Sequence, residues 1–180
     1  LFDADYPGCK ANRTWPIAPD KQSLGQRWNV LRAENDKGRK ANLFKETRDR
    51  TVVKTLGDGI FAHEFRAGSV LDDKGGVVEP ARYGFRSLDR QFIIPDKRLI
   101  DFERPQLWEH YSNKQCFLTG LFAHPPSNGP ALSITALIPD QHHYRGSFGG
   151  RAIPLWANAA ATQPNVRQAL LSELSLLYGR

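Results

Sequence analysis

The chain has 180 residues, of which 40% are hydrophobic and 11% aromatic, and it carries a formal net charge of +6. Its length fits one domain, or one domain and the start of another, and its apolar content excludes a disordered tail. No apolar run reaches the roughly 20 residues that a membrane-spanning helix needs. The N-terminus, LFDADYPGCK, lacks the pattern of a secretory signal. The sequence contains no Met, so we expect a fragment of a longer polypeptide.

The positive charge is concentrated in one segment. Between Lys10 and Lys54 there are twelve Lys and Arg against five Asp and Glu, while the rest of the chain is nearly balanced. Such an asymmetry indicates a polyanionic partner, in particular a nucleic acid. A solvated basic surface without a partner is the alternative.

The first predicted element is a helix over residues 21–35. Its apolar face is formed by Leu24, Trp28 and Leu31. Gly38 follows in a charged run and indicates a turn. From Thr51 the pattern changes to β-branched and alternating residues, which predict strands. These strands span residues 51–56, 60–65 and 69–71.

The second half of the chain is predicted to be richer in strands. Its apolar runs lie at residues 90–94, 116–122, 131–138 and 152–156. The runs at 116–122 and 131–138 are typical of buried strands. A short helix is predicted over residues 104–112, with Pro105 suited to its first turn. Because strands outnumber helices and do not alternate with them, we expect an α+β fold with a mixed sheet and flanking helices.

An amphipathic helix is predicted at the C-terminus, over residues 164–180. Its apolar face is formed by Val166, Leu170, Leu174 and Leu177. We expect residues 1–160 to form one domain and residues 161–180 to begin a helical region.

Motifs for catalysis are weak in this sequence. It contains neither of the glycine-rich loops that cradle phosphates, nor the G-x-S-x-G turn of hydrolases. Asp72-Asp73-Lys74 spells the D-x-K of many nucleases, but the glycines that follow favour a tight turn. The segment His124–Asn128 (HPPSN) lacks the polar and aromatic positions of the amino-methyltransferase motif. We therefore expect no catalytic residue and no cofactor in this chain.

A metal site is not expected either. His142 and His143 are adjacent, and no further His or Cys is close to them in sequence. Cys9 and Cys116 have no CxxC neighbour, which gives no support to a zinc site. Cys116 is expected to be buried, a disulfide between the two cysteines stays open, and the cytoplasm is the expected compartment.

Two sets of residues are candidates for contacts with DNA. Phosphate contacts provide affinity without sequence information and are expected from the basic segment. The favoured residues are Arg39, Lys40, Lys45, Arg48 and Arg50, with Arg90 and Arg98 as further possibilities. Base contacts are expected from loops, because Gln can pair with adenine and Arg with guanine. The loop residues are Gln141, His142, His143, Tyr144 and Arg145, with residues 124–128 as a second loop. A polar surface loop without a DNA contact is the alternative.

The stretch FRSLDRQFII, residues 85–94, resembles the "YRPFD-x-R-W-x-Y-Y" signature of Type ISP restriction–modification enzymes. Arg86 and Asp89 match the Arg and Asp of that signature, and Ser87 replaces its proline. Both charged residues are expected to stabilise the fold by pairing with other segments, because positions i and i+3 of a strand face opposite ways.

Further blocks extend the resemblance from about residue 27 to residue 179. AIPLW, residues 152–156, is similar to the strand that ends the recognition domain of these enzymes. The segment from Asn165 to Gly179 resembles the first helix of the tail that follows it.

The resemblance implies sequence-specific recognition of double-stranded DNA by the specificity part of a larger enzyme. S-adenosylmethionine, ATP and Mg²⁺ would then be bound by adenine-N6 methyltransferase and helicase or nuclease domains elsewhere in the polypeptide. Two alternatives stay open from the residues themselves. One is an interdomain scaffold that contacts protein, and the other is a catalytic nuclease or methyltransferase fragment.

Overall fold

The computed structural model describes residues 1–56, 68–86, 89–122, 127–129, 132–144 and 150–179. The elements in chain order are β1 (Tyr6–Pro7), β2 (Ile17–Ala18), α1 (Lys21–Ala33), α2 (Lys37–Phe44), β3 (Ala81–Gly84), β4 (Arg90–Ile93), α3 (Pro105–Glu109), β5 (Phe117–Gly120), β6 (Leu132–Thr135), β7 (Ile138–Pro139), β8 (Arg151–Pro154) and α4 (Gln168–Tyr178). Helices and strands are thus combined without strict alternation, which confirms the predicted α+β class.

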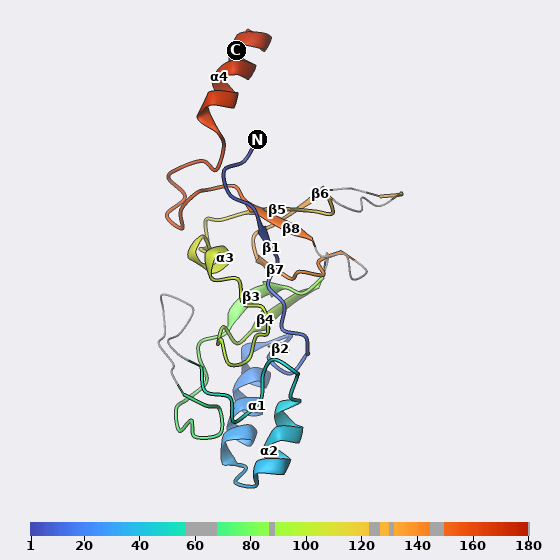
Figure 1. The fold of residues 1–180 in the computed structure, drawn as a ribbon, viewed down its shortest axis with the longest axis vertical. Coiled ribbons are helices and arrows are strands. Elements are labelled where there is room, and N and C mark those ends of the chain that lie inside the picture. The colour runs from blue at the N-terminus through green and yellow to red at the C-terminus, as the bar shows by residue number, and fades with distance from the viewer. Residues whose placement is uncertain (57–67, 87–88, 123–126, 130–131, 145–149, 180) are drawn as a thin grey trace.

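The strands form two small sheets. The first has the order β1-β8-β5-β6 and is antiparallel throughout. The second has the order β2-β4-β3-β7, with β3 and β7 parallel and its other pairs antiparallel. Figure 1 shows the second sheet between the first sheet and the α1–α2 pair. Cys9 links the sheets, since it follows β1 and forms a bridge to Asp140, which follows β7; Lys10 forms a further bridge to Phe102.

Helix α1 confirms the prediction from apolar spacing. Asp20 caps it, because its side chain accepts a hydrogen bond from the backbone N–H of Ser23 at 2.7 Å. Leu24, Trp28 and Leu31 are buried along one face. They contribute to one of two core clusters, which lies beneath α1 and α2, while the other lies between the sheets and α3.

Helix α2 shows that the turn predicted at Gly38 was wrong. Asp36 accepts a hydrogen bond from the N–H of Arg39 at 2.8 Å and so starts a helix with Gly38 in its first turn. Phe44 at the other end is fully buried and lies against Trp15, with ring centroids 5.7 Å apart. The cap and this anchor outweigh the roughly 1 kcal/mol by which Gly disfavours a helix.

The strands predicted over residues 51–56 and 69–71 were also wrong. The structure has turns there, with one isolated bridge between Leu56 and Gly68. Val52 is fully buried, and its carbonyl accepts a hydrogen bond from the N–H of Leu71 at 2.8 Å. Burial accounts for Val52 and Val70 of this β-branched pattern, whereas Val53 is 42% exposed. Residues 60–65 lie outside the described part of the chain.

The run predicted as one buried strand over residues 131–138 is divided between both sheets. Its first part is β6 and its last residue begins β7. Leu132 and Ile134 of β6 are 44% and 66% exposed, whereas Ser133 and Thr135 are partly buried. The apolar side chains of β6 therefore face outward, opposite to the expectation. The strands predicted at 90–94, 116–122 and 152–156 and the short helix at 104–112 are confirmed by β4, β5, β8 and α3.

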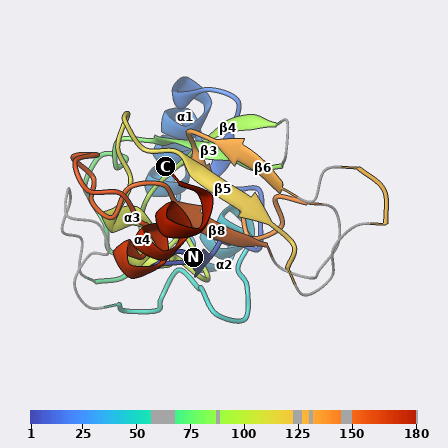
Figure 2. The ribbon, with the colours of Figure 1, turned by 90° about the horizontal axis from the view of Figure 1, so that it is seen from above.

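Helix α4 has no buried residue. The chain before it packs on the body through Asn165, whose side chain is hydrogen-bonded to Ala4 and Pro154, and through Arg167, whose backbone N–H donates to the carbonyl of Leu1 at 3.1 Å. Beyond that point α4 projects past the first sheet (Figure 1), and in the view from above it is seen end-on in front of that sheet (Figure 2). Among the described residues, no helix combines the length and apolar character needed to cross a membrane.

Candidate nucleic-acid interface

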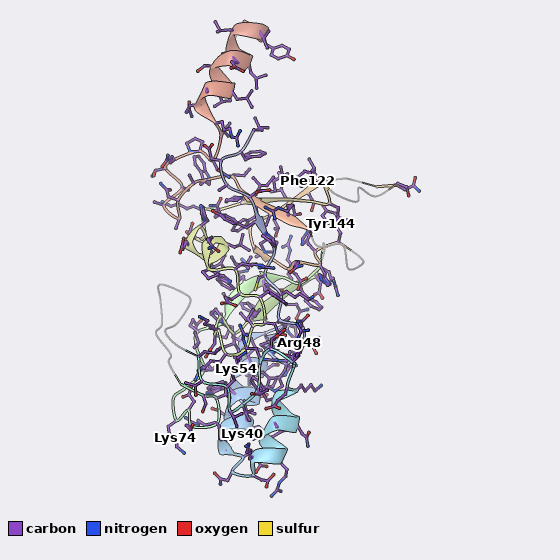
Figure 3. All side chains as sticks on the ribbon, in the orientation of Figure 1. Lys40, Arg48, Lys54, Lys74, Phe122 and Tyr144 are labelled. Atoms are coloured by element: carbon purple, nitrogen blue, oxygen red, sulfur yellow. The ribbon has the colours of Figure 1, made fainter. Side chains whose placement is uncertain are left out.

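Three of the five basic residues predicted to contact phosphate are exposed. Arg39 lies in α2, Lys45 ends it in a left-handed conformation, and Arg48 follows in a loop. The side chains of Arg39 and Arg48 are 75% and 89% exposed, and their ion pairs with described residues are to carboxylates close in sequence. In Figure 3, Arg48 lies on the same side of the body as Tyr144 and Phe122, whereas Lys74 projects on the opposite side.

Lys40 and Arg50, by contrast, are buried. Lys40 Nζ donates to the carbonyl of Leu71 at 3.3 Å. Arg50 donates to the carbonyls of Lys97 and Asp101 and pairs with Glu103 at 3.2 Å. Both side chains therefore join the basic segment to the rest of the fold. Their burial leaves Arg39, Lys45 and Arg48 as the accessible part of the predicted set.

The predicted base-contacting loop has one anchored end. His143 is buried and its Nε2 lies 3.3 Å from Ser133 Oγ, while Tyr144 OH donates to the Thr119 carbonyl at 2.9 Å. These two side chains therefore fix the loop against β5 and β6. Gln141 and His142 are only partly buried.

The remaining loop predictions fall largely outside the described residues. Arg145 and residues 124–126 are not among the residues that the structure describes. Ser127 and Asn128 of the second candidate loop are described and exposed.

A groove with a cavity of about 240 Å³ lies between three segments of the chain. One wall is the continuous run of residues 10–14, and another is formed by Phe85 and Arg86 after β3. The third is formed by residues 140 and 142, next to β7. Sequence analysis did not identify this groove, because the three segments are distant in sequence and the tertiary fold brings them together.

Arg86 is held at the edge of this groove. Its Nη1 donates to the carbonyl of His142 at 2.6 Å, and its guanidinium lies over the Phe85 ring, 4.9 Å from the centroid. The residue is nevertheless exposed. An arginine stacked on an aromatic ring and fixed by one hydrogen bond is oriented in advance for a further acceptor.

Asp140 forms part of the groove wall and is itself buried. Its carboxylate accepts hydrogen bonds from Tyr83 OH and from the N–H of His142, both at 2.5 Å. Burial raises the pKa of this carboxyl, and the two hydrogen bonds oppose that effect. Burial also lowers the pKa of the His142 and His143 rings. Gly8 is required beside Asp140, because a Cβ there would lie 2.5 Å from its carbonyl carbon.

The two aspartates considered for a nuclease motif have partners within the fold. Asp73 forms an ion pair with Arg98 at 2.7 Å, and Asp72 accepts a hydrogen bond from Ser69. Across the described ranges, no group of three or more His, Cys, Asp or Glu is arranged to hold a metal ion. Both cysteines are free; Cys9 is buried, whereas Cys116 is only partly buried, contrary to the expectation.

The sequence matches the family described as the Type ISP C-terminal specificity domain over residues 1–179. The chain belongs to this family. No curated protein matches the chain.

Solved structures share the fold of this Type ISP specificity domain at low identity. A cryo-EM structure of a DrdV–DNA complex is 12% identical, with a TM-score of 0.61, over 99% of this chain and 18% of that one. A nuclease-deletion mutant of the Type ISP restriction–modification enzyme LlaGI, in complex with a DNA substrate mimic, is 15% identical, with a TM-score of 0.57, over 99% and 15%. The ATP-dependent Type ISP enzyme LlaBIII bound to DNA is 14% identical, with a TM-score of 0.60, over 97% and 12%. This chain therefore spans only a small part of the length of each neighbour.

The signature residues of the Type ISP specificity domain lie at a β-hairpin, not within a strand as expected. Arg86 and Asp89 belong to the turn between β3 and β4, where the N–H of Phe85 donates to the carbonyl of Asp89 at 3.1 Å. The Asp89 side chain accepts a hydrogen bond from Gln91, and Arg86 donates to His142. Arg86 thus pairs with another segment, as expected, but it also faces solvent. The described partner of Asp89 is local to the hairpin, which differs from the expected pairing with another segment.

Proposed function

We propose that this chain recognises a specific sequence in double-stranded DNA, as the specificity domain of a restriction–modification polypeptide in the cytoplasm. The family match over residues 1–179 carries the proposal. The printed descriptions of three neighbours of the same fold, each a complex with DNA or a DNA mimic, support it. The neighbours are far longer than this chain. The methyltransferase and helicase or nuclease activities, with S-adenosylmethionine, ATP and Mg²⁺, are therefore proposed to reside in other domains.

Within this proposal, affinity comes from exposed cations and specificity from the loop after β7. Arg39, Lys45 and Arg48 are the proposed phosphate contacts of the basic segment. They are exposed and lie within ten residues of one another in the sequence, so they can contact neighbouring phosphates of one DNA strand. Gln141 and His142 are the proposed base contacts among the described loop residues, and Arg145 stays a candidate from its side-chain chemistry alone.

Selection from a randomised duplex library tests the function directly. The full-length protein that carries this chain is incubated with the library, and the bound duplexes are recovered and sequenced. Enrichment of one consensus, with binding that weakens steeply as salt rises, is expected. Binding without enrichment would leave only non-specific affinity. No binding, or binding with little salt dependence, would favour a scaffold that contacts protein.

Replacing Gln141 by Ala tests the loop assignment. Loss of a bidentate contact to adenine should reduce discrimination at one base pair by about 1–3 kcal/mol. Affinities of the full-length protein for the enriched duplex and its single-base variants measure this change. Gln22→Ala, at an exposed glutamine of α1, is the matched control and should leave discrimination unchanged. Unchanged discrimination at every position in Gln141→Ala would contradict the assignment.

A further inference from the structure

We infer that the groove between residues 10–14, the turn after β3 and the segment after β7 binds one phosphate of the DNA backbone between Lys10 and Arg86. This inference rests on the proposed function and adds a phosphate contact that involves none of Arg39, Lys45 and Arg48. It is carried by the shape of the groove and by the charges on its walls.

Arg86 supplies an oriented group of donors. Its guanidinium has five N–H donors in a fixed plane, and the His142 carbonyl accepts from Nη1 at 2.6 Å. Stacking on Phe85 restricts the rotation of the side chain. Little conformational entropy is therefore lost when a phosphate oxygen accepts from the remaining donors.

Lys10 supplies a second cation from the opposite segment. It is partly exposed, and its ammonium lies 5.6 Å from the centre of the Phe102 ring. Lys10, Arg86 and His142 all line this groove, so both charges face the same recess. A backbone phosphate between Lys10 and Arg86 would be attracted by both cations.

The other charged groups of the groove are buried and held by partners within the fold, although the buried Nε of Arg13 has no hydrogen-bond partner among the described residues. Arg13 pairs with Asp101 at 3.6 Å and donates to the Leu99 carbonyl at 3.0 Å. The Asp140 carboxylate accepts hydrogen bonds from Tyr83 and His142 and is buried. Among the described residues that line the groove, Lys10 and Arg86 are the accessible cations, so the accessible charge of this part of the groove is positive.

The recess favours a phosphate over a base edge. Phosphates are the outermost charged groups of a duplex, whereas base edges lie at the floor of a major groove about 8.5 Å deep. A side chain that contacts bases must protrude from the protein. Arg86 is instead held against Phe85 and His142 at the groove, where a phosphate on the outside of the duplex is the nearer acceptor.

Salt-dependent DNA binding by the full-length protein tests the inference. Lys10→Ala and Arg86→Ala are compared with wild type on two labelled duplexes, one with the enriched sequence and one scrambled. Each variant should weaken binding to both duplexes by the same factor. The slope of log affinity against log salt should become less steep by about 1. Arg86→Lys should retain most of the slope, because the charge remains. Lys74→Ala is the control, since Lys74 is exposed and lies in the turn beside α1.

Three results would overturn the inference. The first is a wild-type slope and affinity in either alanine variant. The second is a loss of discrimination between the duplexes in Arg86→Ala at unchanged slope, which would make Arg86 a base contact. The third is failure of the wild-type protein to bind any duplex. This result would reject the proposed function itself, and it differs from the first two because it concerns the wild-type protein. Thermal melting of each variant, with Lys10→Gln and Arg86→Lys as milder substitutions, separates a lost contact from a lost fold.

Discussion

At the scale of single residues, charge in the sequence did not indicate exposure. Arg98 was a possible phosphate contact, but it is 2% exposed. Its Nη2 lies 2.5 Å from Asp96 and 2.7 Å from Asp73, and it also donates to the Ser69 carbonyl. The ion pairs connect the turn after β4 to residues 69–73, so Arg98 stabilises the fold and is not accessible to DNA.

Replacing Asp96 by Asn tests this role of Arg98. Removing one partner leaves a buried charge that is only partly compensated, so the free energy of unfolding should fall by about 3 kcal/mol. Urea denaturation measures it. Arg90→Ala, at an exposed cation of β4, should change the same quantity by less than about 0.5 kcal/mol. Equal effects of the two variants would show that the buried pairs contribute no more than a surface charge.

The raised pKa of Asp140 predicts that the free energy of unfolding depends on pH. Burial raises its pKa in the folded chain above the ordinary value of 3.8. The folded state therefore binds the proton more tightly than the unfolded state does. This contribution to stability is complete below 3.8 and is lost as pH rises through the raised pKa. Asp140→Asn cannot titrate, so the unfolding free energy of wild type minus that of the variant should fall as pH rises from about 3.8. A difference that is constant with pH would contradict the raised pKa.

At the scale of elements, α1 and α2 differ in how much of them the sequence predicted. Both begin at an aspartate that accepts a hydrogen bond from the third residue after it. In α1 the spacing of three apolar residues also marks the buried face. In α2 the buried residues are Lys40 and Phe44, and a buried lysine cannot be recognised from an apolar pattern.

The cap of α2 can be tested by substitution. Asp36→Ala removes the acceptor for the N–H of Arg39 and should lower the free energy of unfolding by about 1 kcal/mol. Chemical denaturation measures the loss. Asp36→Ser keeps a capping oxygen and should recover most of it. If Ser and Ala at this position were equally destabilising, the hydrogen bond would not be the cause.

At the scale of the whole molecule, the folded body ends before α4. Asn165 is 1% exposed, and its side chain is hydrogen-bonded to Ala4 near the N-terminus and to Pro154 at the end of β8. After it, α4 places Leu176 and Leu177 at 86% and 77% exposure. An isolated helix of this length is marginal in water, so α4 contributes little to the stability of the body.

Deletion of residues 168–180 tests this division. The thermal midpoint should change by less than about 2 °C, because no residue of α4 is buried. Asn165→Ala is the matched comparison and should lower the midpoint by several degrees, since it removes buried hydrogen bonds. A large loss of stability on deletion of α4 would show that the helix does pack on the body.

The sequence by itself determined the α+β class, α1, most strands of the second half, and the resemblance to Type ISP enzymes. These depend on periodicity, capping residues and short motifs, which are local properties. The tertiary structure decided which charged residues are accessible. Lys40, Arg50 and Arg98 are buried because carbonyl and carboxylate partners distant in sequence compensate them. It also brought Lys10, Arg86 and His142 to one groove. Burial and pairing depend on contacts between distant segments, and no local pattern encodes those contacts.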